Sequence, residues 1–244
     1  MNPDCAFTPA ALDDFDQFER NGFQVIKSLV RTDECDGLTA ELTPLFEKRQ
    51  KAAGGPIGGL RNLLRSSPQV LQYASSARLV SLLETAGGAS AFAVRAIFFD
   101  KNPEANWLVP WHQDVAIPVR SRIETPGFTG WSIKEGVLHV HPPREILEGM
   151  FTVRLHLDDC SAGNGALRVL PGSHLCGKLD ASEIARWTTS NQALVCELSK
   201  GDALVMRPLL LHSSPPADRP AHRRVLHIEY ATSGLPEGLN WCER

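Results

Sequence analysis

The feature that most constrains the fold is a change in sequence pattern near residue 91. From there to residue 231, short runs rich in Val, Ile, Leu and Phe alternate with Pro and Gly. Short strands at this spacing are typical of an all-β sandwich or barrel and not of βαβ units. The expected strands lie at 91–99, 137–140, 150–157, 166–170, 193–198, 202–207 and 223–230.

The first 90 residues have helical periodicity instead. Thr8 can cap a helix whose first residue is Pro9 and which Gly22 ends. Apolar residues then recur at helical spacing between residues 32 and 49. The other expected elements are a strand at 23–30, a glycine-rich loop at 52–59 and helices near 66–74 and 76–86.

Length favours a single domain. A chain of 244 residues can bury about 70–75% of its unfolded surface, and it contains no internal repeat. We expect a mainly β protein, with helices up to about residue 90 that pack on a β core at about 91–231. Residues 121–147 are rich in Pro and Gly and form an expected lid-like insert. The single domain then covers residues 1–244.

Charge and composition argue against several classes of protein. The net charge is −3, whereas nucleic-acid-binding domains usually carry a strongly basic face. No apolar run approaches the ~18 residues of a membrane helix, and the N-terminus has no signal-peptide pattern. The six cysteines form no C-x-x-C motif, which favours reduced thiols. We predict a cytoplasmic protein without nucleic-acid or membrane partners, whereas the sequence does not indicate its oligomeric state.

The most informative motif is the segment VPWHQDV at 109–115. It places His112 and Asp114 two residues apart, and such residues share a face if both lie on a strand. His212, at the end of the segment GDALVMRPLLLHSS, offers a third ligand. Two histidines and one carboxylate form the facial triad of non-haem Fe(II) oxygenases. A single His-x-Asp motif also fits a surface histidine beside a solvated aspartate, so the rest of the pattern must decide.

A cationic residue completes the pattern. Arg223 follows His212 by eleven residues, and it can reach the same cavity if 203–212 and 223–230 are neighbouring strands. A buried guanidinium group binds a carboxylate through two hydrogen bonds, and Ser214 can add a hydroxyl donor. An open metal site beside such a carboxylate site suits a keto-acid co-substrate.

These segments together resemble the phytanoyl-CoA dioxygenase (PhyH-like) family of Fe(II)/2-oxoglutarate-dependent oxygenases. The resemblance rests on segments that follow in the family's order across most of the chain, and the NGAL…LPGSH run together with HQD is much more specific than either alone. The segments are NGFQVI at 21–26, VRAIFFDKNP at 94–103, VPWHQDV at 109–115, VRLHLDDCSAGNGALRVLPGSH at 153–174, GDALVMRPLLLHSS at 201–214 and HRRVLHIEYA at 222–231.

The resemblance implies a double-stranded β-helix, which is a cupin-like jelly roll, with flanking N-terminal helices. It implies that His112, Asp114 and His212 bind Fe(II), and that Arg223, with Ser214 assisting, binds the distal carboxylate of 2-oxoglutarate. Arg224 is the alternative, because a slip by one residue would turn it to the other face of the strand. Related halogenases carry Ala or Gly at the carboxylate position, so Asp114 favours oxygenation with O2, most simply hydroxylation that releases succinate and CO2.

Other residues are open to two interpretations. Arg95 fits a contact with co-substrate or substrate, or a surface position on an edge strand, and Lys101 is expected in solvent. Arg154 and His156 either are exposed, which we favour, or line the barrel. The remaining candidates are His139, His141 and Trp131 as lid, substrate or packing residues, His174 as a structural loop residue, and Arg61 at the mouth of the site.

Three functional hypotheses follow. The first is an Fe(II)/2-oxoglutarate-dependent hydroxylase of a small molecule. The second is a cupin-like metal enzyme that acts on a chelating substrate without 2-oxoglutarate. The third is a non-enzymatic β-sandwich that binds a ligand and carries its histidines by chance. No dedicated binding site for coenzyme A phosphates is evident, so the substrate stays open.

Overall fold

The computed structural model describes residues 15–244, so the expected start of the first helix at Thr8 and Pro9 lies outside the described residues. Seven α-helices occur in the described part of the chain, and the first five precede the main run of strands. They are α1 (Phe15–Asn21), α2 (Thr32–Ala53), α3 (Leu63–Ser66), α4 (Pro68–Ala74), α5 (Ala77–Thr85), α6 (Arg144–Glu148) and α7 (Ala181–Ser190).

Twelve strands form three antiparallel sheets within the same residues. The major sheet has the order β1-β10-β7-β12-β2, the minor sheet β3-β11-β8-β9, and the third sheet β4-β6-β5. The strands are β1 (Phe23–Ile26), β2 (Phe92–Lys101), β3 (Val109–His112), β4 (Ile117–Pro118), β5 (Thr129–Lys134), β6 (Val137–His141), β7 (Met150–His156), β8 (Leu167–Val169), β9 (Leu194–Cys196), β10 (Ala203–Met206), β11 (His212–Ser214) and β12 (Arg223–Ala231).

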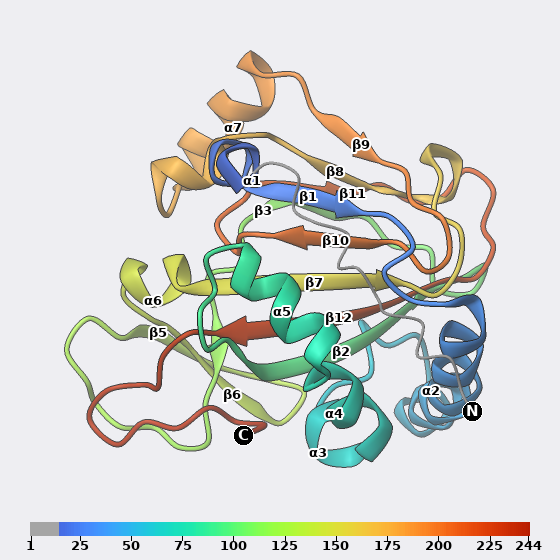
Figure 1. Cartoon of the computed structure of the whole chain (residues 1–244), viewed down its shortest axis with the longest axis horizontal. Helices are drawn as coiled ribbons and strands as arrows, with labels where there is room; N and C mark the ends of the chain where they lie inside the picture. Colours follow the sequence, from blue (N-terminus) through green and yellow to red (C-terminus); the bar gives the residue numbers. More distant parts are fainter. Residues whose placement is uncertain (1–14) are drawn as a thin grey trace, which may run out of the picture.

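The two faces of the major sheet have different chemistry. On one face, apolar side chains such as Phe98, Leu155 and Ile228 pack against the helices α1 to α5 in a single buried cluster. Figure 1 shows helix α5 lying across strands β7 and β12 on this side, with α4 and α3 following it past the β2 edge. Because side chains alternate along a strand, the intervening residues face the minor sheet. Several of those residues are charged, and they line a cavity between the two sheets.

This arrangement confirms the predicted mainly β jelly roll with N-terminal helices. One assumption about neighbouring strands was wrong, because β7 lies between β10 and β12 in the major sheet. Arg223 is therefore not adjacent to β10; it pairs with Lys101 at the end of β2. Helical and strand periodicity identify single elements but do not specify the order of strands in a sheet.

The segment at 121–147 is more regular than a loop. It contains β5, β6 and α6, and β6 pairs with both β5 and β4. The sequence predicted a strand at 137–140 but not its partner at Thr129–Lys134, where only two of six residues are even half-buried. Movement of this insert as a lid stays a prediction. Across residues 15–244, no helix combines the length and the apolar character that crossing a bilayer requires.

Candidate metal centre

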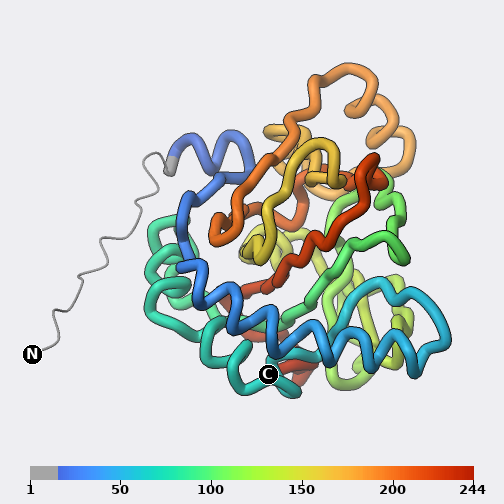
Figure 2. Tube along the Cα trace, turned by 90° about the vertical axis from the view of Figure 1, so that its right-hand side faces the viewer, coloured from blue at the N-terminus to red at the C-terminus, as the bar shows by residue number. Residues whose placement is uncertain are grey.

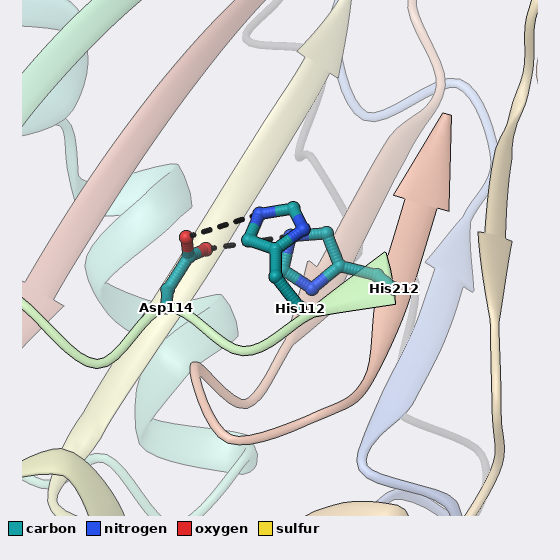
Figure 3. A group of neighbouring side chains, drawn as sticks. All are labelled: His112, Asp114 and His212. Atoms are coloured by element: carbon teal, nitrogen blue, oxygen red, sulfur yellow. Dashed lines mark ion pairs between the residues drawn. The ribbon is translucent and has the colours of Figure 1, made fainter. Parts of the chain in front are cut away.

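Three of the predicted site residues meet in the cavity between the major and minor sheets. In Figure 3 the side chains of His112, Asp114 and His212 point toward one another. The Nε2 atom of His112 lies 3.8 Å from Oδ1 of Asp114, and Nε2 of His212 lies 3.6 Å from Oδ2. One ligand atom from each residue lies within 4.8 Å of the other two, an arrangement of His, Cys, Asp or Glu found nowhere else in the described residues.

Strand pairing and a loop bring the three residues together. His112 ends β3 and pairs with His212, which begins β11 of the minor sheet. Asp114 lies beyond the end of β3, and its backbone amide donates a hydrogen bond to the carbonyl of Pro208. The expectation that His112 and Asp114 share one strand face was therefore wrong in detail, because a hydrogen bond to the loop before β11 positions the carboxylate.

Both imidazole rings are fixed in the tautomer that a metal requires. The Nδ1 atom of His112 lies 2.8 Å from the carbonyl of Pro110, and Nδ1 of His212 lies 2.9 Å from that of Leu210. A carbonyl only accepts hydrogen bonds, so each Nδ1 carries the proton and each Nε2 keeps a free lone pair. Such contacts of the second ring nitrogen orient metal-binding histidines in proteins generally.

The protonation states of the three groups also suit a cation. Burial lowers the pKa of His212 to about 4, so its imidazole is neutral at pH 7. Burial alone would raise the pKa of Asp114, but interactions with the neighbouring histidines, chiefly His212, and with Arg95 hold it well below its usual range. The Oδ2 atom of Asp114 is buried without a hydrogen-bond partner among the described residues. A divalent cation between the three side chains would satisfy this oxygen, so the residues fit the predicted metal.

A buried guanidinium group lies in the same cavity. The side chain of Arg223 is 4% exposed, and no carboxylate contacts it in the described part of the chain. Its Nη2 atom is 3.5 Å from the hydroxyl of Ser214, and its Nε atom is buried without a partner. Arg224 instead forms an ion pair with Asp158 outside the cavity, so the structure favours Arg223 over Arg224 as the group that awaits an anion.

A family model named "Phytanoyl-CoA dioxygenase (PhyH)" matches residues 18–225, which include all of the residues above. The chain belongs to this family. The predicted family is confirmed, and with it the enzyme class, an oxygenase that depends on iron and 2-oxoglutarate.

Curated relatives support this assignment. The rat and human proteins named "Phytanoyl-CoA dioxygenase, peroxisomal" (Rattus norvegicus and Homo sapiens) are each 22% identical to this chain. Each alignment covers 88% of this chain and 67% of the relative.

Solved structures share the fold. AviO1 from Streptomyces viridochromogenes Tue57 is 22% identical with a TM-score of 0.67, over 91% of this chain and 95% of its own. EctD from S. alaskensis, solved with 2-oxoglutarate and 5-hydroxyectoine, is 18% identical with a TM-score of 0.70, over 93% and 77%. The epimerase SnoN, solved with Fe3+, alpha ketoglutarate and nogalamycin RO, is 16% identical with a TM-score of 0.65, over 92% and 89%.

The sequence analysis was wrong about Lys101, which lies beside the site. It was expected in solvent but is 2% exposed, and its ammonium group donates hydrogen bonds to the hydroxyl of Ser214 at 2.8 Å and to the carbonyl of Pro215. The reason is the length of β12, whose first residue, Arg223, pairs with Lys101 and keeps the end of β2 inside the sheet.

Arg154 and His156 were also expected to be exposed, and this was wrong. Both lie on the inner face of β7 and are at least 93% buried. Arg154 donates a hydrogen bond to Nδ1 of His227 at 2.9 Å and lines the cavity, and burial together with Arg223 lowers its pKa to about 10. The available signal was the alternation of polar and apolar residues on β7, which does not say which face is the interior.

A buried network in this PhyH-family protein links the major sheet to the third sheet along the cavity. Arg95 forms an ion pair with Glu229 and lies 3.3 Å from Nε2 of His139 on β6. His227 links Glu229 to Arg154. Arg95 therefore lines the cavity, as expected of a residue that contacts co-substrate or substrate. Although β2 is an edge strand, Arg95 is not exposed on the surface.

The remaining candidates separate into two groups. His139, His141 and Arg61 line the cavity, and His139 is buried, not part of an exposed loop. Trp131 packs against a neighbouring apolar cluster and does not line the cavity. His174 contacts the backbone carbonyl of Glu19 through Nε2, as expected of a structural residue.

Proposed function

We propose that this protein is an Fe(II)- and 2-oxoglutarate-dependent hydroxylase that inserts oxygen into an unactivated C–H bond of a small molecule. In this proposal His112, Asp114 and His212 hold the iron. Arg223 binds the distal carboxylate of 2-oxoglutarate, assisted by the Ser214 hydroxyl. The bound iron supplies the O2 chemistry that converts 2-oxoglutarate to succinate and CO2 and oxygenates the substrate.

The observation that carries the proposal is the match between two separate features of one cavity. At one feature, two Nε2 lone pairs and an unpartnered Asp114 oxygen converge. At the other, Arg223 is buried without a counter-ion among the described residues. A keto acid whose other end is a carboxylate would contact both, and a carboxylate on a buried guanidinium forms strong charge-assisted hydrogen bonds.

The chain's own residues orient and shield the reactants. The Ser214 hydroxyl accepts from Lys101 and lies 3.5 Å from Nη2 of Arg223, and it donates its hydrogen to the carbonyl of Gly165. In the proposal this hydrogen turns from Gly165 to the distal carboxylate, which Arg223 binds from the other side. Arg95 lines the cavity and stays fixed by Glu229, and we propose that it borders the co-substrate or substrate. The cavity has a volume of about 370 Å³, near the lower end of ligand pockets, which supports a compact substrate.

The decisive experiment measures succinate formed from 2-oxoglutarate by purified protein supplied with Fe(II). Succinate formation should require Fe(II) and should disappear in His112→Ala, which should also lose stoichiometric Mn(II) binding. Arg223→Gln should weaken 2-oxoglutarate binding by about 10- to 100-fold, the value of a charged hydrogen bond. Arg224→Gln is the matched control, since its side chain lies outside the cavity, and it should leave this affinity unchanged.

The same variants discriminate the two alternatives. A cupin-like enzyme that does not use 2-oxoglutarate would bind Mn(II) through His112 but would show no response of 2-oxoglutarate binding to Arg223→Gln. A non-enzymatic β-sandwich would bind neither the metal nor the keto acid stoichiometrically. Either result would contradict the proposed function.

A cytoplasmic location is part of the proposal. The described cysteines are all free, as thiols are in a reducing compartment. The net charge of −3 supports the expectation that the protein binds neither nucleic acid nor a membrane. Fractionation of cells that express the native gene would test the location.

A further inference from the structure

The cavity carries an excess of positive charge. Five Arg and Lys side chains line it, whereas Asp114 is the one carboxylate among its lining residues. Two further carboxylates contact these cations: Glu229 pairs with Arg95, and Glu135 pairs with Arg61. The cavity and its ion-pair partners thus carry five positive and three negative charges. Two positive charges remain that no described side chain of this group balances. Lys101, behind Arg223, is not included in this count.

The proposed cofactors do not remove this excess. Fe(II) carries two positive charges and 2-oxoglutarate carries two negative charges, so together they add none. Arg95, Arg154 and Arg223 are buried, where charges without partners are unfavourable, whereas Lys134 at the mouth is exposed. A further anion in the cavity would therefore be stabilised, and the substrate is the remaining component of the reaction.

One of the two surplus charges lies at the mouth, where two segments meet. The loop between α2 and α3 supplies Arg61, and the end of β5 supplies Lys134. Figure 2 shows that loop, in light blue to cyan, beside the yellow-green β5–β6 hairpin. The Nε atom of Arg61 lies 3.3 Å from Oε1 of Glu135 at the turn of the hairpin. Within residues 15–244, the two terminal nitrogens of Arg61 form no hydrogen bond or ion pair.

Two histidines near the mouth add no charge of their own. Burial lowers the pKa of His139 to about 4, and Arg95 and Lys134 contribute to the shift. The pKa of His141 is also lowered, by burial and by Lys178 and Lys134. Both rings are neutral at pH 7, so they can donate or accept hydrogen bonds without adding charge.

We propose that the substrate carries an anionic group, a carboxylate or a phosphate monoester, which Arg61 and Lys134 bind at the mouth of the cavity. This inference rests on the proposed function, since it treats the interior of the cavity as the iron and 2-oxoglutarate site. Glu135 occupies one edge of the Arg61 guanidinium group and competes with the substrate's anion for it. The anionic end then stays at the mouth and the carbon to be oxidised points inward.

The test uses protein loaded with Zn(II), which does not support turnover, and with 2-oxoglutarate. The probes are octanoate, octyl phosphate and octanamide, together with 3-phenylpropionate and its amide. Ligand-observed NMR gives their dissociation constants. We expect at least one acid or the phosphate to bind about tenfold or more tightly than the matched amide. The better of octanoate and octyl phosphate identifies the anionic group.

Variants localise the binding. Arg61→Gln and Lys134→Gln should each weaken binding of the anionic probe by about tenfold and leave the affinity for 2-oxoglutarate unchanged. Glu135→Gln should strengthen it, because the competing carboxylate is removed. Lys48→Gln is the matched control: it removes one positive charge from the exposed surface of α2 and should change nothing.

Three results would overturn the inference. They are equal binding of acids and amides, no binding of any anionic probe, and anion binding that is unaffected by both Arg61→Gln and Lys134→Gln. Each of these leaves the proposed function intact as long as the parent protein binds Zn(II) and 2-oxoglutarate. Failure of the parent protein to bind them would contradict the proposed function and the inference together.

Discussion

At the scale of single residues, the cavity places cations close together without enough anions. Lys101 shows the consequence, since burial and the neighbouring Arg223 lower the pKa of its ammonium group to about 7. Its hydrogen-bond acceptors, the Ser214 hydroxyl and the Pro215 carbonyl, are both neutral. A carboxylate bound at Arg223 would favour the charged form of Lys101, so binding of 2-oxoglutarate should be linked to uptake of a proton.

This linkage predicts that 2-oxoglutarate binds more weakly as the pH rises from 7 to 9. Lys101 is increasingly neutral above pH 7, and binding must then recruit the proton from solvent. Lys101→Met should weaken binding about 10- to 100-fold at pH 6 and should flatten the pH dependence. Titration of the Zn(II)-loaded protein with 2-oxoglutarate at several pH values measures both effects. An unchanged slope in Lys101→Met, with Lys48→Met as control, would show that another group is responsible.

The proposed metal ligands are the residues whose convergence the sequence predicts best. His112, Asp114 and His212 belong to short motifs, and their chemistry restricts which residue types can serve. Lys101 and Arg154 were placed wrongly because burial of a charged side chain depends on the surrounding sheets. A strand pattern gives the alternation of its side chains, but both faces of a strand in this jelly roll are covered.

At the scale of elements, the apolar runs in the sequence predicted where most strands lie. They did not predict which strands pair with each other. The strands β7 and β12 lie where their apolar runs predicted them. The strand β5 was missed because it is mostly exposed. Neighbours such as β7 and β12 are far apart in sequence, and their pairing depends on the whole sheet.

The contact between β12 and α4 can be tested with the two tyrosines of the chain. The hydroxyl of Tyr230 on β12 is buried and donates a hydrogen bond to the carbonyl of Ala74 at 2.9 Å. Tyr230→Phe should lower the free energy of unfolding by about 1 to 2 kcal/mol, because a buried acceptor loses its donor. Urea denaturation measures the difference.

Tyr73 supplies the matched control for this change. Its hydroxyl is buried but has no hydrogen-bond partner among the described residues, so Tyr73→Phe removes a group that gains nothing from burial. We expect Tyr73→Phe to be neutral or slightly stabilising. Equal destabilisation by both substitutions would mean that packing of the oxygen atom, and not its hydrogen bond, is what matters at Tyr230.

At the scale of the whole molecule, the C-terminal residues join the helical layer to the major sheet. The side chain of Glu243 is 6% exposed. Its Oε2 atom accepts hydrogen bonds from the backbone amides of Leu64 on α3, at 3.0 Å, and of Ala96 on β2, at 3.3 Å. Burial raises the pKa of Glu243 to about 7 despite these two donors.

The raised pKa makes the stability of the fold depend on pH in a defined window. Between pH 4.5 and pH 7, Glu243 keeps its proton in the folded state and loses it in the unfolded state. The folded state then binds more protons, so the free energy of unfolding falls as the pH rises through this window. The full shift corresponds to roughly 3 to 4 kcal/mol.

Glu243→Gln should remove this contribution, because an amide oxygen still accepts from both backbone donors but does not titrate. The variant should be more stable than the parent at pH 8, and the difference should shrink toward pH 4.5. Urea denaturation at pH 4.5 to 8 measures the two curves, and histidines that titrate in the same range cancel in their difference. Glu84 lies on the exposed surface of α5. The curve of unfolding free energy against pH for Glu84→Gln should therefore run parallel to that of the parent protein. A Glu243→Gln curve that also runs parallel would mean that this carboxyl ionises normally and that its burial does not weaken the fold.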